Sequence, residues 1–513
     1  MLRGKYYLGV RVRADTMRRA NEDVRETGIM ANGNEICRMD AVTLAGKVRS
    51  KELSPVEVIE ANLERMDKLE PVLHAFCTPG PDQARAAAKQ LEVDIMAGKD
   101  PGPLAGVPVS IKDLVCTKDL PTVSGSFIYK DFSGGVDDIV VERLRAAGAI
   151  VTGKTNVPEF GYSGVGHNPV FETTRNPWDL ERTPGGSSAG AGAAVASGMG
   201  PFAIGSDGGG SVRIPASFSG LVGIKASMGR VPLWPGTKDE TLPGVSSWES
   251  LECIGPISRT VADSALMLSV ISGPDMRDRR TLPEANFDWM ECLKGDLKGL
   301  RVAYSADLGY TPVDPEVRQI VGEAANVFAS ELGCTVVEAN PGWDDPYGAF
   351  WGLVAAESDL VGLRKLADEH AHHMTPHLVD FIRAPWTAEA FTDALMARKA
   401  VANKSAEFMA NYDLLLTPTL TVPAFALHIQ GIEKVDGQIV PPFQWLAFTF
   451  PFNMTGQPAA SVPAGFTKDG LPVGLQIIGR HLDDPAVIRA CASFEKARPW
   501  ANKWPALLEE MGL

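Results

Sequence analysis

The sequence predicts an α/β fold in which a β-sheet is covered by helices, and three observations carry this prediction. Short apolar runs typical of buried strands alternate with longer segments whose apolar residues recur at helical spacing. The chain has 513 residues, which is enough for a large buried core. Its composition, 45% hydrophobic and 22% charged, is that of a folded globular protein.

The expected elements follow this apolar pattern. Helical segments are expected at residues 40–70 (as two helices), 81–97, 137–147, 261–272, 315–332 and a long region near 346–411. Strands are expected at VPVSIKD (107–113), 149–153, 301–304, 334–338, and at the later runs LLLTPTLTVP, AASVPAG and VGLQIIG. Ser54 and Pro55 fit a helix cap and first turn. No internal repeat is evident, so we expect residues 30–513 to form one domain.

The N-terminal segment, residues 1–29, has basic residues but no apolar core of signal-peptide length. Two interpretations stay open for it: a flexible extension before Met30, or a helical arm used in the contacts of a homodimer. No apolar run is long enough to cross a bilayer, so no membrane association is expected.

Charge and cysteine usage narrow the possible partners. The formal charge of -14 and the pI near 5.2 argue against nucleic-acid or anionic-membrane binding, which both need clustered Lys and Arg. The seven cysteines form no CxxC pair, so neither a zinc site nor a disulfide framework is indicated. A reducing cytoplasm is the simplest setting.

A segment rich in Gly and Ser, residues 161–230, interrupts the alternation. Apolar residues break its glycines repeatedly, so it is expected to be buried rather than to form a flexible linker. In SDGGGS, three glycines before Ser211 leave successive backbone N–H groups uncovered, and VRIPASF could begin a helix. The N–H groups of such a turn could bind an oxyanion. A phosphate site is the rival interpretation, but GxxxxGK[ST] is absent.

Three motifs together are more specific than any one: GVPVSIKD at 106–113, TPGGSSAG at 183–190 and GSDGGGSVRIPAS at 205–217. With them the chain resembles the amidase signature family from about Leu44 to Pro499, including NPWDLERTPGGSS and PFNMTGQPAASVPAG. The resemblance implies a large twisted mixed sheet with helices on both faces. It also implies that residues 340–450 lie over the site and select the acyl group.

The resemblance implies a catalytic set for amide hydrolysis. Ser211 would be the acyl-forming nucleophile, Ser187 the bridging serine on a cis peptide after Gly186, and Lys112 the base. The N–H groups of the oxyanion hole would be those of Gly208, Gly209, Gly210 and Ser211. No metal or organic cofactor is implied, and the partner is a small-molecule amide.

Three supporting residues complete the implied site. Ser188 and Asp207 would orient the glycine loop and Arg213 would brace it, although a purely structural ion pair is equally open for Arg213. Gly208 departs from the family pattern, since many members carry a side chain there. The absence of a side chain at position 208 could widen the oxyanion hole or loosen the loop.

The lysine needs a lowered pKa to act as a base, and burial without an adjacent carboxylate supplies that. The apolar run before Lys112 suits burial. Asp113 is its neighbour, but consecutive strand residues point to opposite faces. A neutral Lys112 could then draw a proton from Ser187 as Ser187 draws one from Ser211.

Each candidate also has a plain interpretation. A lone lysine ending a strand is usually a solvated charge, and lone serines are usually turn or cap residues. The histidine cluster at 370–377 suggests metal-ligand spacing, but HExxH is absent and Pro376 disturbs a helix, so a solvated surface is favoured. Cys116 lies close to Lys112, yet no partner histidine is identifiable.

The aromatic residues of the 340–450 region suggest the substrate. The candidate pocket residues are Trp351, Phe443, Trp445, Phe448 and Phe450. Core packing explains most such residues singly, but as a group they favour an apolar or aryl amide as the substrate.

Two other functions stay open: the A subunit of a tRNA-dependent amidotransferase, whose glutamine-site pattern we do not find here, and a non-catalytic binding protein of the same fold.

Overall fold

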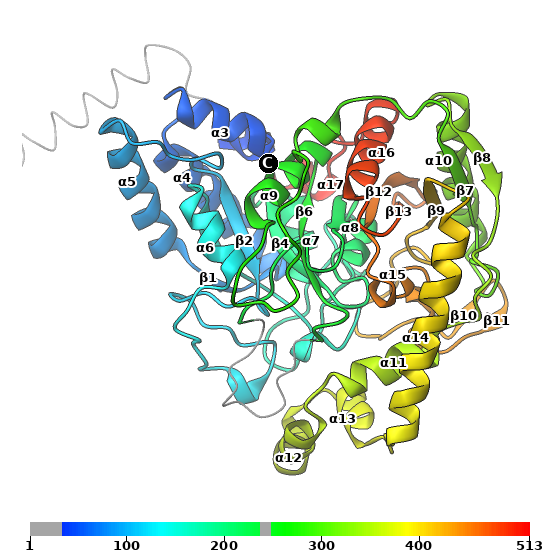
Figure 1. Ribbon diagram of the computed structural model, residues 1–513. Coiled ribbons are helices and arrows are strands. Elements are labelled where there is room, and N and C mark those ends of the chain that lie inside the picture. The colour runs from blue at the N-terminus through cyan, green and yellow to red at the C-terminus, as the bar shows by residue number, and fades with distance from the viewer. Residues whose placement is uncertain (1–32, 236–247) are drawn as a thin grey trace, which may run out of the picture.

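The computed structural model describes residues 33–235 and 248–513, so the predictions for residues 1–29 lie outside the described part. Eleven of the described strands form one mixed sheet (Figure 1). In spatial order they are β1 (Phe76–Pro79), β3 (Ile150–Thr155), β2 (Pro108–Lys112), β4 (Phe202–Asp207), β6 (Cys253–Ser258), β5 (Val222–Lys225), β12 (Ala459–Phe466), β13 (Pro472–Gly479), β9 (Leu414–Pro418), β7 (Arg301–Tyr304) and β8 (Thr335–Glu338). Two short strands, β10 (Lys434–Val435) and β11 (Gln438–Ile439), pair separately.

The described helices surround this sheet (Figure 1). In the first half of the chain they are α2 (Gly33–Arg38), α3 (Ala41–Arg49), α4 (Pro55–Leu73), α5 (Pro81–Met96), α6 (Ile139–Ala146), α7 (Ala189–Ala196) and α8 (Arg213–Ser219). In the second half they are α9 (Val261–Ile271), α10 (Pro315–Ser330), α11 (Tyr347–Ala356), α12 (Leu360–His370), α13 (Pro376–Arg383), α14 (Ala388–Met409), α15 (Pro451–Met454), α16 (Asp484–Ala497) and α17 (Ala506–Glu510). None of these helices combines the length and the apolar character needed to cross a bilayer.

Alternating residues of β4 show that helices cover both faces of the sheet. Ala203 packs in a cluster with residues of α7 and α8, whereas Phe202 and Ile204 join the larger cluster that contains residues of α9 and α16. Successive strand residues point to opposite faces, so Ala203 contacts α7 and α8 on one side of the sheet, and Phe202 and Ile204 pack on the other side. The expected α/β fold with a mixed sheet covered on both faces is therefore confirmed.

Most helix predictions hold, and Ser54 caps α4 with a complete capping box that includes Glu57. The long helical region expected near 346–411 is helical over most of its length and is divided into α11 to α14. Asp359 caps α12 by accepting from Gly362 N, Pro376 begins α13, and α13 ends before Pro385. Proline is favoured in the first turn of a helix and disfavours helical conformation in the residue before it, so Pro376 and Pro385 fit the start and the end of α13.

The Gly/Ser-rich segment is buried, as expected, and forms α7, β4, α8 and β5. Strands β2 and β4 are parallel neighbours, with Ile111 opposite Ile204. Their carboxyl ends therefore meet at one edge of the sheet, and these ends carry Lys112 and Asp207. This edge brings the sequence motifs together.

Candidate active site

Lys112, the last residue of β2, is fully buried and points at two serines. Its Nζ lies 2.7 Å from Ser187 Oγ, 2.9 Å from Ser206 Oγ and 3.1 Å from the Ser206 carbonyl oxygen. A lysine held by three short polar contacts at the edge of a sheet is not a solvated surface charge. The structure thus brings together Lys112 and Ser187, which are 75 positions apart in the sequence.

Burial lowers the pKa of Lys112 to about 8, although the more distant carboxylates of Glu252 and Asp207 act to raise it. Asp113 does not contribute to this, because its side chain lies on the other face of β2. There it forms a buried ion pair with Lys154 at 3.3 Å. A lysine with a pKa near neutrality can be deprotonated at modest cost and can act as a base.

Ser187 lies in the loop before α7, and the peptide bond between Gly186 and Ser187 is cis. A Cβ on Gly186 would stand 2.5 Å from the Val165 carbonyl oxygen, so a side chain is sterically excluded at this position. The neighbouring Ser188 joins this loop to β4, since its Oγ lies 3.4 Å from both the N and the O of Ser206.

The second loop connects β4 to α8 and carries Ser211, which is half-buried, whereas Gly210 and Val212 on either side are buried. A Cβ on Gly185 would come within 2.8 Å of Ile214, so the Ser187 loop packs against the start of α8, just beyond Ser211. Ser211 is therefore the accessible serine on a loop that adjoins the Lys112–Ser187 pair.

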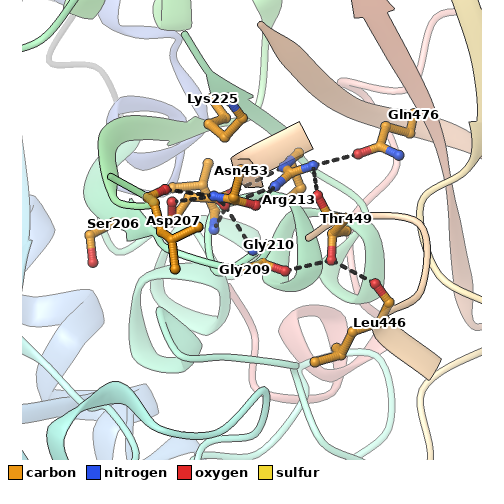
Figure 2. Close-up of polar contacts among 12 residues, drawn as sticks. Ser206, Asp207, Gly209, Gly210, Arg213, Lys225, Leu446, Thr449, Asn453 and Gln476 are labelled. Carbon is orange, nitrogen blue, oxygen red and sulfur yellow. Dashed lines mark hydrogen bonds and ion pairs between the residues drawn. The ribbon is translucent and has the colours of Figure 1, made fainter. Parts of the chain in front are cut away.

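Asp207 organises the glycine loop (Figure 2). Its Oδ1 accepts from Gly210 N at 2.8 Å and its Oδ2 from Val212 N at 3.3 Å. Arg213 donates to both oxygens, from Nε at 2.9 Å and from Nη2 at 2.8 Å. Burial alone would raise the pKa of Asp207, but the Arg213 guanidinium and the other donors lower it to about 2. The carboxylate stays charged and holds the loop in one conformation.

Figure 2 also shows contacts from the C-terminal half that sequence reasoning missed. Asn453 Nδ2 donates to the carbonyl of Asp207 at 2.7 Å, and its Oδ1 accepts from Arg213 Nη2 at 2.7 Å. Thr449 Oγ1 donates to the carbonyl of Gly209 at 2.6 Å. Gln476 Oε1 accepts from Arg213 Nη1 at 2.6 Å. Ser206, against Lys112, was missed as well. Polar residues inside apolar runs are the signal that could have found them, because buried polar groups need partners.

The N–H groups of the glycine loop differ in their availability. That of Gly210 is engaged by Asp207. Those of Gly208, Gly209 and Ser211 have no hydrogen-bond partner among the described residues. Three such donors within one four-residue turn can receive an oxyanion. Gly210, expected to be a fourth donor, instead fixes the loop.

The small residue at Gly208 is matched by a large one nearby. A Cβ on Gly208 would lie 2.8 Å from the Trp248 ring, so this indole fills the space that a side chain at 208 would take. A Cβ on Gly209 would lie 2.6 Å from the Phe350 ring. Two aromatic rings therefore pack on the loop, and the loosening expected from Gly208 does not follow.

A cavity of about 230 Å³ lies beside these rings. It is lined by Tyr162, Tyr347, Trp351, His377, Leu378, Phe381, Ala384, Trp386 and Phe443. Tyr162 packs edge-on against Trp248 with ring centroids 4.7 Å apart, and Phe350 packs on Trp351 at 5.4 Å. The cavity walls are thus continuous with the two rings that cover the glycine loop.

Two of the five expected pocket residues line this cavity, Trp351 and Phe443. The prediction is wrong for Trp445, Phe448 and Phe450, which are at most 1% exposed. Trp445 stacks on Phe218 with centroids 5.7 Å apart, and Phe450 stacks on Phe350 at 4.8 Å. These rings fill the space between the sheet and the covering helices, so they belong to the core.

The residues considered for other chemistry lie elsewhere. Within residues 33–235 and 248–513, no group of three His, Cys, Asp or Glu side chains could hold a metal ion. His377 lines the aromatic cavity, where burial lowers its pKa to about 4. Burial raises the pKa of the Cys116 thiol to about 11, which is unfavourable for a thiolate nucleophile.

Comparisons with known proteins identify the family of this chain. A family model described as Amidase matches residues 57–488. An acylamidase of Rhodococcus erythropolis is 40% identical over 475 residues, covering 91% of this chain and 97% of the relative. The A subunit of the glutamyl-tRNA(Gln) amidotransferase of Geobacillus thermodenitrificans is 36% identical over 489 residues, covering 90% and 97%. A solved bacterial aryl acylamidase described as an amidase signature enzyme has a TM-score of 0.83 and 32% identity, covering 90% and 97%. The chain therefore belongs to the amidase signature family.

Proposed function

We propose that this protein is an amidase that hydrolyses a carboxylic amide through an acyl-enzyme on Ser211. The observation that carries the proposal is the 2.7 Å contact between the buried Lys112 Nζ and Ser187 Oγ. In the reaction, neutral Lys112 takes the Ser187 proton while Ser187 takes the proton of Ser211. Ser211 Oγ then forms a bond to the amide carbon.

The tetrahedral intermediate places negative charge on the former carbonyl oxygen. The N–H groups of Gly208, Gly209 and Ser211 are free to stabilise it, whereas that of Gly210 is engaged by Asp207. The proton held by Lys112 returns through Ser187 to the leaving amine, and the C–N bond breaks. Water, deprotonated by the same relay, then releases the acid and restores Ser211.

The substrate we propose is an apolar or aryl amide. Six of the nine residues that line the cavity are aromatic, and no Asp, Glu, Lys or Arg is among them. Burial keeps His377 neutral at physiological pH because it lowers the pKa of the imidazole. Pockets are lined by groups that match their ligand, so a charged acyl group would lose its hydration here without gaining a partner. The acylamidase and aryl acylamidase relatives support the same class.

A panel of aliphatic, aryl, dicarboxylic and ureido amides, ranked by kcat/KM, tests this proposal. We expect aryl amides to lead. Trp351→Ala should lower kcat/KM for aryl amides by about tenfold, as expected for a lost apolar contact of about 1–3 kcal/mol, and leave acetamide nearly unchanged. A preference for malonamate-like or ureido acids by about tenfold would refute the apolar pocket but not the catalytic set.

A second function is favoured by the 36% identity to the A chain of a tRNA-dependent amidotransferase. Such a protein would release ammonia from glutamine and pass it to partner subunits. Co-purification of partners together with glutaminase activity would establish it. A non-catalytic binding role is the third possibility, and covalent labelling of Ser211 by a fluorophosphonate would exclude it.

A further inference from the structure

A second cavity, of about 300 Å³, lies apart from the aromatic one. It is lined by Met228, Ser250, Arg280, Arg398, Met454, Thr455, Gly456 and His481. In contrast to the aromatic cavity, it contains two guanidinium groups and an imidazole, and no carboxylate is among its lining residues. Neither the proposed reaction nor the aromatic pocket uses any of these groups.

Arg280 is the most unusual member of this set. Among the described residues, the only acceptor that its guanidinium meets is the thioether of Met228, with Nη2 3.2 Å from Sδ. A thioether is a weak acceptor, and a guanidinium offers five N–H donors in a planar fork that suits oxyanions. Arg280 therefore brings an unneutralised charge and unused donors to the cavity.

The charges around the cavity leave an excess of positive charge. Arg398 donates to Ser250 Oγ, and its Nη1 lies 3.7 Å from Glu357 Oε1. Arg280 also acts electrostatically on Glu357, so this one carboxylate faces two arginines. Two other described acids are engaged elsewhere: Glu249 is paired with Arg279, and Asp278 accepts from the backbone N–H groups of Arg280 and Leu233. Among the described residues, Glu357 is the only carboxylate within ion-pair distance of either guanidinium group, at 3.7 Å from Arg398, and this excess of guanidinium groups favours an anionic ligand.

We propose that this cavity binds a small oxyanion, a phosphate or a carboxylate, between Arg280 and Arg398. Its volume is at the lower end of the range for small-molecule sites, so it suits inorganic phosphate or a small organic acid. Apolar ligands are disfavoured, because the guanidinium groups would lose hydration without gaining a partner.

The cavity also adjoins the supports of the glycine loop. Ser250 precedes Leu251, whose carbonyl accepts from Asn453 Nδ2 at 3.0 Å. The same amide nitrogen donates to the carbonyl of Asp207. On the opposite wall, Met228 N donates to the Gly456 carbonyl at 3.1 Å. A bound anion would join the segment at 250 to the segment at 454–456, and both of these segments hold Asn453.

Isothermal titration of the full chain with inorganic phosphate, and separately with citrate, tests the site. Sodium chloride keeps the ionic strength constant. We expect saturable one-site binding of at least one anion, and the two arms tell a phosphate site from a carboxylate site. Arg280→Gln should weaken binding at least about tenfold, because a charge-assisted fork is lost, and Arg280→Lys should weaken it less. Arg318→Gln, which changes an exposed arginine that does not line the cavity, should stay within about twofold.

The proposal would be overturned if neither phosphate nor citrate showed saturable binding, or if wild type and Arg280→Gln bound the anion equally well. Loss of binding through misfolding is detected by thermal unfolding, which Arg280→Gln should leave near wild type because the only hydrogen bond of the Arg280 guanidinium among the described residues is to a thioether. The labelling rate of Ser211 should change with the anion in wild type and not in Arg280→Gln. If it is constant in both, the link to the glycine loop is wrong although the site stands.

Discussion

The glycine loop and the helices α11 to α14 both border the proposed site, but different interactions hold them. In the loop, Asp207 and Arg213 are fully buried and bonded to each other, to backbone N–H groups and to Asn453. Among the helices, α11 and α13 instead line a cavity with aromatic rings, and α12 and α14 leave apolar side chains such as Val361 and Met396 largely exposed. Directional bonds fix the reacting groups within narrow limits, whereas ring packing can adapt to different acyl groups.

The largest expected effect is at the base. Lys112→Ala should lower kcat by at least about 10³-fold, because neither serine then has a group to take its proton. Ser211→Ala should abolish covalent labelling by a fluorophosphonate. Steady-state kinetics and intact-mass measurement check both variants. Ser187→Ala should keep a trace of activity, since the N–H donors remain; equal activity in all three variants would end the mechanism.

The next effect concerns the stability of the loop. Arg213→Met should lower the free energy of unfolding by about 3–5 kcal/mol, because it leaves the Asp207 carboxylate buried without its partner. Denaturant unfolding followed by circular dichroism measures the change. Arg279→Met is the matched control, because it removes an arginine from an exposed ion pair and should cost at most about 1 kcal/mol. Equal losses in both variants would show that the buried pair has no special role.

The pH dependence follows from the lowered pKa of Lys112, which is about 8. The neutral amine is the active form, so its fraction falls as the pH drops through this value. We expect kcat/KM to decline about tenfold per unit below the apparent pKa and to level off above it. A profile that is flat from about pH 5 to 10 would contradict a lysine base.

Local sequence predicted one part of this site and distant contacts decided the rest. Ser211, Asp207 and Arg213 lie within seven residues, so a turn and the start of α8 nearly determine their arrangement. Asn453 reaches the same loop across 246 positions, and no local pattern contains that contact. The core fold was predictable for the same reason as the loop, because strand and helix periodicity is local.

The aromatic pocket shows more clearly what could not be predicted from the sequence. The run from Phe443 to Phe450 suggested a lining, but an aromatic residue has the same signature in a cavity wall and in a core. Trp445 is fully buried, while Phe443 borders the cavity. Phe381 and Trp386 complete the wall from α13 and the residues after it, and their position beside Trp351 depends on how α11 and α13 pack against each other. Residue type alone could not distinguish the aromatic residues of the cavity wall from those of the core.

The smallest expected effect is at Glu159, which connects the core to the N-terminus of helix α13. Glu159, in the core, is buried and accepts from Thr375 N at 2.6 Å, from Thr375 Oγ1 at 2.7 Å and from Ser126 Oγ at 2.8 Å. Thr375 is the N-cap of α13, which carries His377 and Phe381 into the cavity wall. Burial raises the pKa of Glu159, but its donors oppose that rise.

Glu159→Ala should therefore displace α13 without touching the reacting groups. We expect KM for an aryl amide to rise about threefold to tenfold, with kcat for acetamide unchanged, because a lost buried hydrogen bond is worth about 1–3 kcal/mol. Glu159→Gln should rescue part of the loss, since its amide oxygen can still accept from Thr375. Hydrogen exchange of residues 376–383 supplies a readout independent of substrate, and protection in α13 should fall in the Ala variant. If exchange rises while KM stays constant, α13 is anchored by Glu159 but does not form part of the acyl pocket.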